Sequence, residues 1–291
     1  MVDGRLRKTT DPRARFWRNA KVALTYLVLI ALSCVFLVPF SWMLVTSLTE
    51  ASQIRSLSGI DWTPSPIVWH NYKEALTVLP FHLFLKNTLI ITIACIIGQT
   101  LSASLVAFGF SRMRFPGRNV LFIMVLSTMM LPVQVTQIPT FVLFTHLRWI
   151  DTLKPLIIPA FFGGGAFFIF LLRQFFMTLP SELEDAAKID GCGPLGIYWN
   201  VALPLSKPAL ATVAVFSFMG HWNDFMGPLI YVQSMENKTL ALGLNSFKSL
   251  HGTEYHLLMA ASIAVLLPVL VIFFSAQKYF VQGIVLSGIK G

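Results

Sequence analysis

The stretch NTLIITIACIIGQTLSASLVAFGFS, from Asn87 to Ser111, carries no charged side chain. A helix that crosses the hydrocarbon core of a bilayer needs about 20 largely apolar residues, and this stretch is long enough. It lacks the strict polar alternation of a membrane barrel strand. In lipid, a single segment can hydrogen-bond its own backbone N–H and C=O groups only as a helix. The stretch therefore predicts a transmembrane helix.

Similar uncharged intervals recur on both sides of this stretch, and only one of them is interrupted by a charge, at Asp224. The composition, with 55% hydrophobic and 12% charged residues, does not fit a soluble domain. We therefore expect an all-α integral membrane protein with six transmembrane helices. The other five expected spans are Val22 to Thr49, Asn119 to Leu147, Pro155 to Leu172, Pro208 to about Met235, and Tyr255 to Gln277.

Basic residues are distributed unevenly between the two sets of loops. If the N-terminus is cytoplasmic, fifteen basic residues fall on the cytoplasmic side and seven outside, whereas the loop acids split six and six. Such an excess of Lys and Arg is the usual mark of cytoplasmic loops. The net charge of +9 is thereby explained without nucleic acid, which is not an expected partner. Both termini are predicted to be cytoplasmic.

These signals divide the chain into five parts. Residues 1–21 form a basic cytoplasmic segment, 22–48 the first transmembrane helix, 49–86 an external loop, 87–277 a core of five transmembrane helices, and 278–291 a cytoplasmic tail. Within the core, a long cytoplasmic loop is expected at 178–207. Three isolated cysteines, and two loop histidines without a third ligand, do not predict a metal site.

The cytoplasmic loop carries its own helix signals. Ser181 and Glu184 have the spacing of a capping box, so a short helix is expected from Ser181 to Asp190, with Gly191 as its stop. Pro194 can open a second short helix. This second helix would run from Leu195 to Val201, before Leu203-Pro204 turns the chain back to the membrane. The first helix would offer a small apolar face made of Leu183, Ala186, Ala187 and Ile189.

Two interpretations of this loop remain open on physical grounds. It is either a connector packed on its own spans or a helix that projects to meet a partner. Its residue spacing bears on the choice: Asp185-Ala186-Ala187, three residues, Gly191, nine residues, then Val201, one residue and Leu203-Pro204. This pattern resembles the cytoplasmic signature of binding-protein-dependent importer permeases, with two conservative departures, Asp185 for Glu and Val201 for Ile.

Other segments extend the resemblance over nearly the whole chain. Asn71-Tyr72 and Asn87-Thr88 stand where the sugar-importer branch has its Asn-Tyr and Asn-Ser pairs, and Trp222-Asn223-Asp224-Phe225 is similar to its fifth-span pattern. The first span near Pro39 and the ending from Tyr279 also match. The chain thus resembles the maltose-type sugar permeases of the six-span class. This resemblance implies a type I ABC importer permease core in spans two to six.

The resemblance implies a transport assembly. A second permease subunit would complete the sugar pathway, two cytoplasmic ATPase subunits would bind ATP and Mg²⁺, and an extracytoplasmic sugar-binding protein would deliver the substrate. This chain would bind no cofactor itself and would lie among lipids of a bacterial inner membrane.

The resemblance also implies site residues. The loop helix would dock on an ATPase subunit, where Asp185 could pair with a basic residue and Gly191 would let the chain leave where a side chain would collide. The C-terminal tail would contact the same subunits through Gln282, Gly283 and Lys290. The coupling residues would be Glu184, Asp185, Ala186, Ala187, Asp190, Gly191, Leu203 and Pro204.

Polar residues inside the spans are candidates for the substrate pathway. Asp224 is an intramembrane carboxylate, which is a functional hypothesis by default, so it and Asn223 are candidates; the alternative is that Asp224 makes a structural bond with Asn223 or with neighbouring backbone. Gln134 and Gln137, flanked by Pro132 and Pro139, suggest a bent third span, and they either line the pathway or pack between helices.

Two other classes of function would leave different signals in the sequence. An ATPase would need a P-loop motif, and the sequence contains none; nor does it contain the common hydrolase motifs. A secondary transporter driven by an ion gradient would be expected to show several ionisable residues at mid-membrane and two similar halves. The importer permease is therefore preferred, with the secondary transporter as the alternative.

Overall fold

In a computed structural model, residues 12–56, 62–249 and 252–288 are described. Nearly all of this chain is helical, and the strands in the described part are the two-residue pair β1 (Lys248–Ser249) and β2 (Gly252–Thr253). Four helical segments of the described chain are long and apolar enough to cross a membrane, and the number is up to six if each of two bent pairs of helices is one span. The expected all-α membrane fold is confirmed.

The four segments that qualify without a bent pair fall where spans one, two, four and six were expected. They contain α1 (Pro12–Ser47), α4 (Phe81–Arg112), the segment Lys154–Thr178 and α15 (Tyr255–Gly288). The third of these consists of α7 (Lys154–Ile157), the 3-10 helix η2 (Ile158–Phe161) and α8 (Ala166–Thr178). Its break coincides with Gly164, where a Cβ would lie 2.6 Å from the Gln99 carbonyl oxygen of α4.

The third span is bent sharply, as its prolines predict. α5 (Arg118–Ser127) and the 3-10 helix η1 (Thr128–Met130) meet α6 (Val133–His146) at 98°. The residue before a proline avoids the helical conformation, and Leu131 before Pro132 is extended, so the two halves cannot form one helix.

The fifth span is not the single helix expected between Pro208 and Met235. α12 (Lys207–Trp222) ends after 16 residues, about 24 Å of rise, and a shorter helix α13 (Met226–Tyr231) follows. At its other end α12 meets the segment Pro194–Leu205 at 79°.

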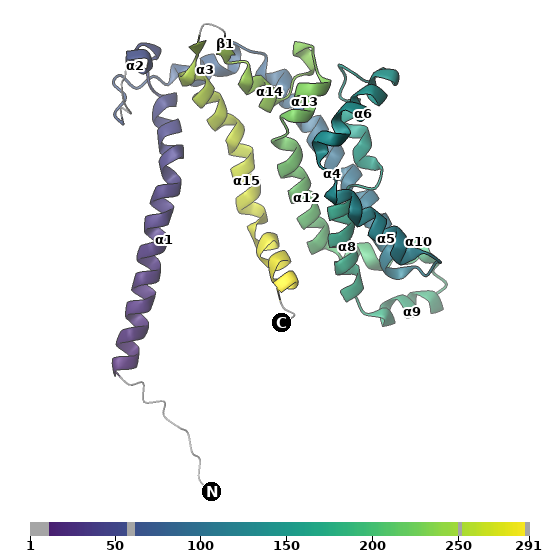
Figure 1. The fold of residues 1–291 in the computed structure, drawn as a ribbon. Coiled ribbons are helices and arrows are strands. Elements are labelled where there is room, and N and C mark those ends of the chain that lie inside the picture. The colour runs from purple at the N-terminus through teal and green to yellow at the C-terminus, as the bar shows by residue number, and fades with distance from the viewer. Residues whose placement is uncertain (1–11, 57–61, 250–251, 289–291) are drawn as a thin grey trace.

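α4 lies at the centre of the core and packs against α8 and α12, whereas α1 stands at one side and contacts α15 (Figure 1). The remaining described elements are short. They are α2 (Ala51–Ser56), α3 (His70–Thr77), α9 (Ser181–Ile189), α10 (Pro194–Ile197), the π-helix η3 (Tyr198–Ala202), α11 (Leu203–Leu205), the 3-10 helix η4 (Met235–Asn237) and α14 (Leu240–Asn245).

The short elements lie at two opposite ends of the bundle (Figure 1). α9 lies at the end where α1 begins and α15 finishes, and we call this the α9 end. α2, α3, α13, α14 and β1 lie at the other end, which we call the loop end. Each end has a buried aromatic cluster, one around Phe108, Phe176 and Tyr198 and the other around Phe84 and Trp222. The two sets of loops therefore lie on opposite sides of the spans.

Candidate functional site

The helix expected in the long loop is present as α9, but it does not begin as the sequence suggested. Pro180 occupies the N-cap position and Ser181 is already helical, without a side-chain capping bond. The capping-box prediction is therefore wrong. Glu184 remains in the first turn, where the helix dipole favours an acid, but its carboxylate is directed to Arg112.

α9 ends in a turn that requires the glycine. The Gly191 and Cys192 amides donate to the carbonyls of Lys188 (3.0 Å) and Ala187 (2.9 Å), which is the Schellman pattern. Gly191 has φ +83°, in the left-handed region that favours glycine. A Cβ at this position would meet nothing within 4 Å inside the chain. The requirement for glycine in the isolated chain is thus conformational, and no internal collision is involved.

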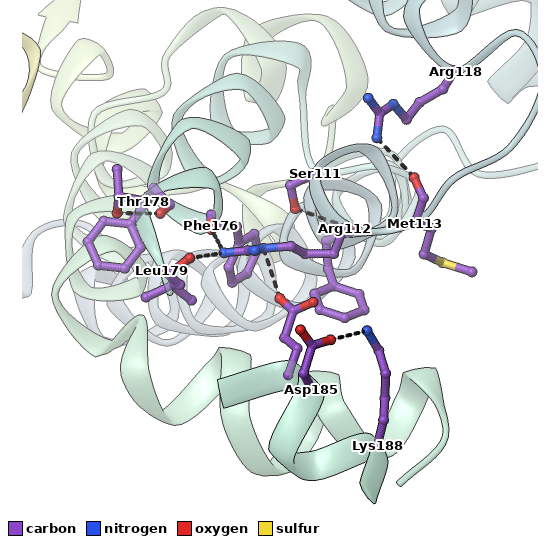
Figure 2. Close-up of polar contacts among 12 residues, drawn as sticks. Ser111, Arg112, Met113, Arg118, Phe176, Thr178, Leu179, Asp185 and Lys188 are labelled. Atoms are coloured by element: carbon purple, nitrogen blue, oxygen red, sulfur yellow. Dashed lines mark hydrogen bonds and ion pairs between the residues drawn. The ribbon is translucent and has the colours of Figure 1, made fainter. Parts of the chain in front are cut away.

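Arg112, the last residue of α4, connects three elements. Its guanidinium Nε lies 2.9 Å from a Glu184 carboxylate oxygen of α9, and both side chains are mostly buried, at 13% and 14% exposure. Its Nη2 donates to the carbonyls of Leu179 (2.6 Å) and Phe176 at the end of α8. Figure 2 shows Arg112 between that end of α8 and the α9 residues Asp185 and Lys188. Sequence reasoning did not identify Arg112.

The predicted apolar face of α9 is divided between the core and the surface. Ala187 is buried in the cluster around Phe176 and Tyr198. Ile189, in contrast, is 87% exposed and Leu183 is 42% exposed, and Ala186 also lies at the surface. α9 therefore rests on the core through one small residue and presents apolar side chains outward.

The remaining acids of α9 lie at its surface. Asp185 accepts a hydrogen bond from Lys188 at 2.8 Å, in an ion pair whose side chains are 66% and 58% exposed. Such exposed ion pairs contribute little to stability, so Asp185 can leave Lys188 for another partner at a small cost in free energy. Asp190, at the C-cap position, is exposed.

The segment after α9 differs from the expected helix Leu195 to Val201 with a turn at Leu203-Pro204. Helical turns run on through α10, η3 and α11, and the bend follows at Ser206. Pro204 has no amide hydrogen to donate, which suits the widened π-turn before it. The Tyr198 hydroxyl lies 2.7 Å from that of Ser104 in α4, so this segment is tied to the core.

The four candidate pathway residues lie on two elements. Gln134 is exposed and Gln137 partly exposed on α6, after the bend of the third span. Asn223 and Asp224 lie in the break between α12 and α13, where Asn223 donates to the Met219 carbonyl (2.8 Å) and Asp224 accepts from the Gly227 amide (3.0 Å). Both acid and amide thus make local backbone bonds.

The candidate tail residues lie at the end of α15. The helix continues to Gly288, so Gln282 and Gly283 are helical rather than part of a separate tail, while Lys290 lies outside the described residues.

The loop end is held by polar side chains that bond to backbone. Asn71 donates to the carbonyls of Ser47 and Thr49 at the end of α1, both at 3.0 Å. Asn87 donates to the carbonyls of Glu236 (2.6 Å) and Lys238 (3.0 Å). These two asparagines belong to pairs that carried the sequence resemblance, and the structure gives them this bonding role.

Asp151 is a further residue at the loop end that sequence reasoning missed. Its carboxylate accepts from the Gln233 amide (2.9 Å), the Ser234 amide (2.8 Å) and the Ser234 hydroxyl (2.9 Å). The bonds from the Ser234 and Gln233 amides lower the pKa of Asp151 below its usual value. Asp151 thereby ties the connection between α6 and α7 to the segment after α13.

Comparison with known proteins identifies relatives that cover most of the chain. A family model described as the binding-protein-dependent transport system inner membrane component matches residues 99–285. The chain is 34% identical over 274 residues to the arabinooligosaccharides transport system permease protein AraQ of Bacillus subtilis (strain 168), covering 93% of this chain and 96% of that protein. It is 35% identical over 230 residues to the sn-glycerol-3-phosphate transport system permease protein UgpE of Yersinia pestis bv. Antiqua (strain Antiqua), covering 76% and 81%.

The fold is similar to that of a solved transporter chain. A crystal structure of a bacterial ABC transporter involved in the import of the acidic polysaccharide alginate contains a chain that matches with a TM-score of 0.78. The identity is 24%, and the match covers 93% of this chain and 99% of that one. At this identity, the likeness concerns the fold.

Proposed function

Because the chain belongs to the family of binding-protein-dependent transport system inner membrane components, a family of multi-pass permeases, we propose that it is a permease subunit that imports a carbohydrate. The substrate is a sugar, an oligosaccharide, or a related polyol or sugar phosphate. The relatives named for arabinooligosaccharides and for sn-glycerol-3-phosphate support this class of hydroxyl-rich substrates. A second permease subunit completes the pathway, and an extracytoplasmic binding protein delivers the substrate. Two cytoplasmic ATPase subunits bind ATP and Mg²⁺ and drive alternating access.

The observation that carries this proposal is the way α9 is held. One buried ion pair, Arg112–Glu184, and one small residue, Ala187, fix its inner face, while Ile189 and Leu183 remain exposed. An exposed apolar pair on a short helix is suited to a partner's hydrophobic groove, which recognises such helices through a few side chains. α9 therefore docks on an ATPase subunit, with Asp185 and Asp190 available to basic groups of that partner.

The remaining coupling residues fix the path of the chain around α9. Gly191 ends the helix in its left-handed turn, and Leu203 and Pro204 continue the helical segment that leads into α12. Movement of α9 with the ATPase would thus be transmitted to α4 through Arg112 and to α12 through this segment. The C-terminal segment contacts the same ATPase subunits, through Gln282 and Gly283 at the end of α15 and through Lys290 after it.

The substrate pathway uses polar groups of the bent spans. Gln134 and Gln137 on α6, and Asn223 and Asp224 at the break of the fifth span, interrupt otherwise apolar segments. Their amide and carboxylate groups can bond to sugar hydroxyls. The α9 end faces the cytoplasm, so both termini are cytoplasmic and the loop end meets the binding protein.

Reconstituted transport tests this function. The complete complex in liposomes should take up substrate only with ATP inside and binding protein outside, and collapse of the proton gradient should leave uptake intact. Uptake without the ATPase, driven by an ion gradient, would instead indicate a secondary transporter.

A paired substitution tests the docking of α9. Ile189→Glu should abolish ATPase stimulation by the binding protein, because it places a charge in the docking groove. Leu195→Glu is the matched control, since Leu195 is also exposed, at 65%, at the same end of the bundle but on α10. If the Ile189→Glu complex is stimulated as strongly as the Leu195→Glu complex, α9 is not the coupling element.

A further inference from the structure

The turn between α4 and α5 carries more positive charge than the structure neutralises. Three arginines lie in it or at its borders, and of these Arg112 is engaged with Glu184 and with carbonyls of α8. Arg118 donates one bond, at 3.1 Å, to the Met113 carbonyl of its own turn. Arg114 is exposed and makes no hydrogen bond or ion pair within the described part of the chain. Arg114 and Arg118 are therefore two cations without an acidic partner among the described residues.

These two arginines line two adjoining hollows. One, of about 430 Å³, is bordered by Arg114, Phe115, Arg118 and Val120. The other, of about 750 Å³, lies between the same arginines and α9. In the second hollow, Glu184 is paired with Arg112 and Asp185 with Lys188. Both acids of that hollow are thus already paired, and Arg118 lies apart from Asp185 and Lys188 in Figure 2.

The surroundings of the first hollow are apolar. Phe115 and Val120 border it at 38% and 57% exposure, and Ile123 and Met124 continue an exposed apolar surface along α5 at 63% and 58%. α4 has 32 residues and rises about 48 Å, well beyond the roughly 30 Å of hydrocarbon, so its end reaches the headgroup region. Cations at headgroup depth beside an exposed apolar surface match a phospholipid, because the cations suit its phosphate and the apolar surface suits its acyl chains.

We propose that Arg114 and Arg118 bind the phosphate of an anionic phospholipid, phosphatidylglycerol being the simplest probe. A guanidinium can offer two parallel donors to phosphate oxygens, which suits this group better than a lysine ammonium. The acyl chains would lie along α5, from Phe115 and Val120 toward Ile123. A soluble phosphate would gain nothing from this apolar border. The inference rests on the proposed cytoplasmic position of the α9 end.

Lipid titration of the full-length protein tests the site. Native mass spectrometry of the complex, stripped of lipid in detergent and titrated with phosphatidylglycerol, gives the affinity of its tightest sites. The double variant Arg114→Gln/Arg118→Gln should weaken one such site by roughly thirtyfold, because each basic side chain near an anionic headgroup contributes on the order of 1 kcal/mol. Arg114→Lys/Arg118→Lys should recover part of this loss. Arg148→Gln, an exposed arginine at the loop end, should change nothing.

Three outcomes would overturn the inference. Unchanged phosphatidylglycerol affinity in the glutamine double variant would show that the two arginines do not bind this lipid. Displacement of the lipid by soluble glycerol phosphate at similar concentration would assign the arginines to a free phosphate. Loss of the ATPase subunits with full retention of lipid would make the hollow a protein-docking surface. None of these readouts requires transport, so a chain that binds lipid as expected but fails in uptake would contradict only the proposed function.

Discussion

The loop end and α9 are attached to the helical core by different kinds of contact. At the loop end, Asn71, Asn87 and Asp151 bond to backbone groups of segments far away in the sequence. At the α9 end, the helix is held by the Arg112–Glu184 ion pair and by Ala187. The first arrangement fixes the course of the backbone through several segments, whereas the second concentrates the attachment of α9 in one pair of side chains.

This difference indicates which end is built to transmit movement. Backbone bonds from several side chains hold loops in one geometry, since each bond constrains where a peptide group lies. A helix attached mainly by one ion pair can shift as a unit without dismantling a network, and its exposed Ile189 and Leu183 remain available to a partner. The α9 end is therefore suited to coupling and the loop end to a fixed scaffold.

The largest effect is expected from breaking the Arg112–Glu184 pair. Arg112→Met should destabilise the α9 end by about 3–5 kcal/mol, because it leaves the mostly buried Glu184 carboxylate unpaired. Thermal unfolding of the purified complex, in a double-mutant cycle with Glu184→Gln, measures the coupling. Lys188→Gln, which breaks the exposed pair on the same helix, should cost less than about 0.5 kcal/mol. Equal effects of Arg112→Met and Lys188→Gln would mean that the ion pair does not hold α9.

The next effect concerns the loop end. Asn87→Leu removes the donor to two carbonyls 149 and 151 residues away, which should cost about 1–3 kcal/mol. Limited proteolysis should then cut the segment around Glu236 faster, while α9 stays protected. Asn200→Leu, an exposed asparagine at the α9 end, is the control. Faster cleavage at α9 in Asn87→Leu would contradict the separation of the two ends.

A smaller effect is expected at Gly191. Gly191→Val places a β-branched residue at φ +83°, at a cost of about 1–2 kcal/mol, and should uncouple ATP hydrolysis from transport while the protein still inserts. Gly191→Asn should retain most coupling, because asparagine tolerates this conformation. Transport and ATPase rates of both variants decide the matter. Equal coupling in the two variants would show that the left-handed turn is not what the site requires.

The spans and α9 could be predicted from the sequence because their signals are local. Uncharged intervals located spans one, two, four and six, Pro132 placed the bend of the third, and Gly191 placed the end of α9. The break between α12 and α13 was not foreseen. Asp224, the charge that interrupts this expected span, lies at the break, but a continuous helix could also carry an isolated Asn223-Asp224 pair.

The contacts of the site could not be predicted because they join distant segments. Nothing in the basic turn after α4 indicates that Arg112 meets Glu184 and the end of α8, or that Asp151 accepts amides of Gln233 and Ser234. The capping box failed for the same reason. Glu184 had two possible partners, and the buried arginine supplied by the fold displaced the local one.

The smallest effect is expected at Asp151, and it depends on pH. The Ser234 and Gln233 amides favour the ionised carboxylate and lower its pKa, so the stabilisation is present above the usual aspartate value of about 3.9. It is lost as the pH falls through the lowered value in the folded state. Asp151→Asn should therefore lower the free energy of unfolding at neutral pH. The loss should be less than about 1 kcal/mol, because solvent screens this partly exposed group.

The pH profile separates the effect of the Asp151 carboxylate from acid unfolding caused by other groups. The difference in the free energy of unfolding between the parent protein and Asp151→Asn should stay constant from neutral pH to about pH 4. It should then vanish as the carboxylate of the parent protein takes up a proton. Asp190→Asn, which alters an exposed carboxylate at the α9 end, should show no difference at any pH. If the difference in the free energy of unfolding persists below the lowered pKa, the charge of Asp151 does not stabilise the loop end. The side chain would then hold the loops only through packing and uncharged hydrogen bonds.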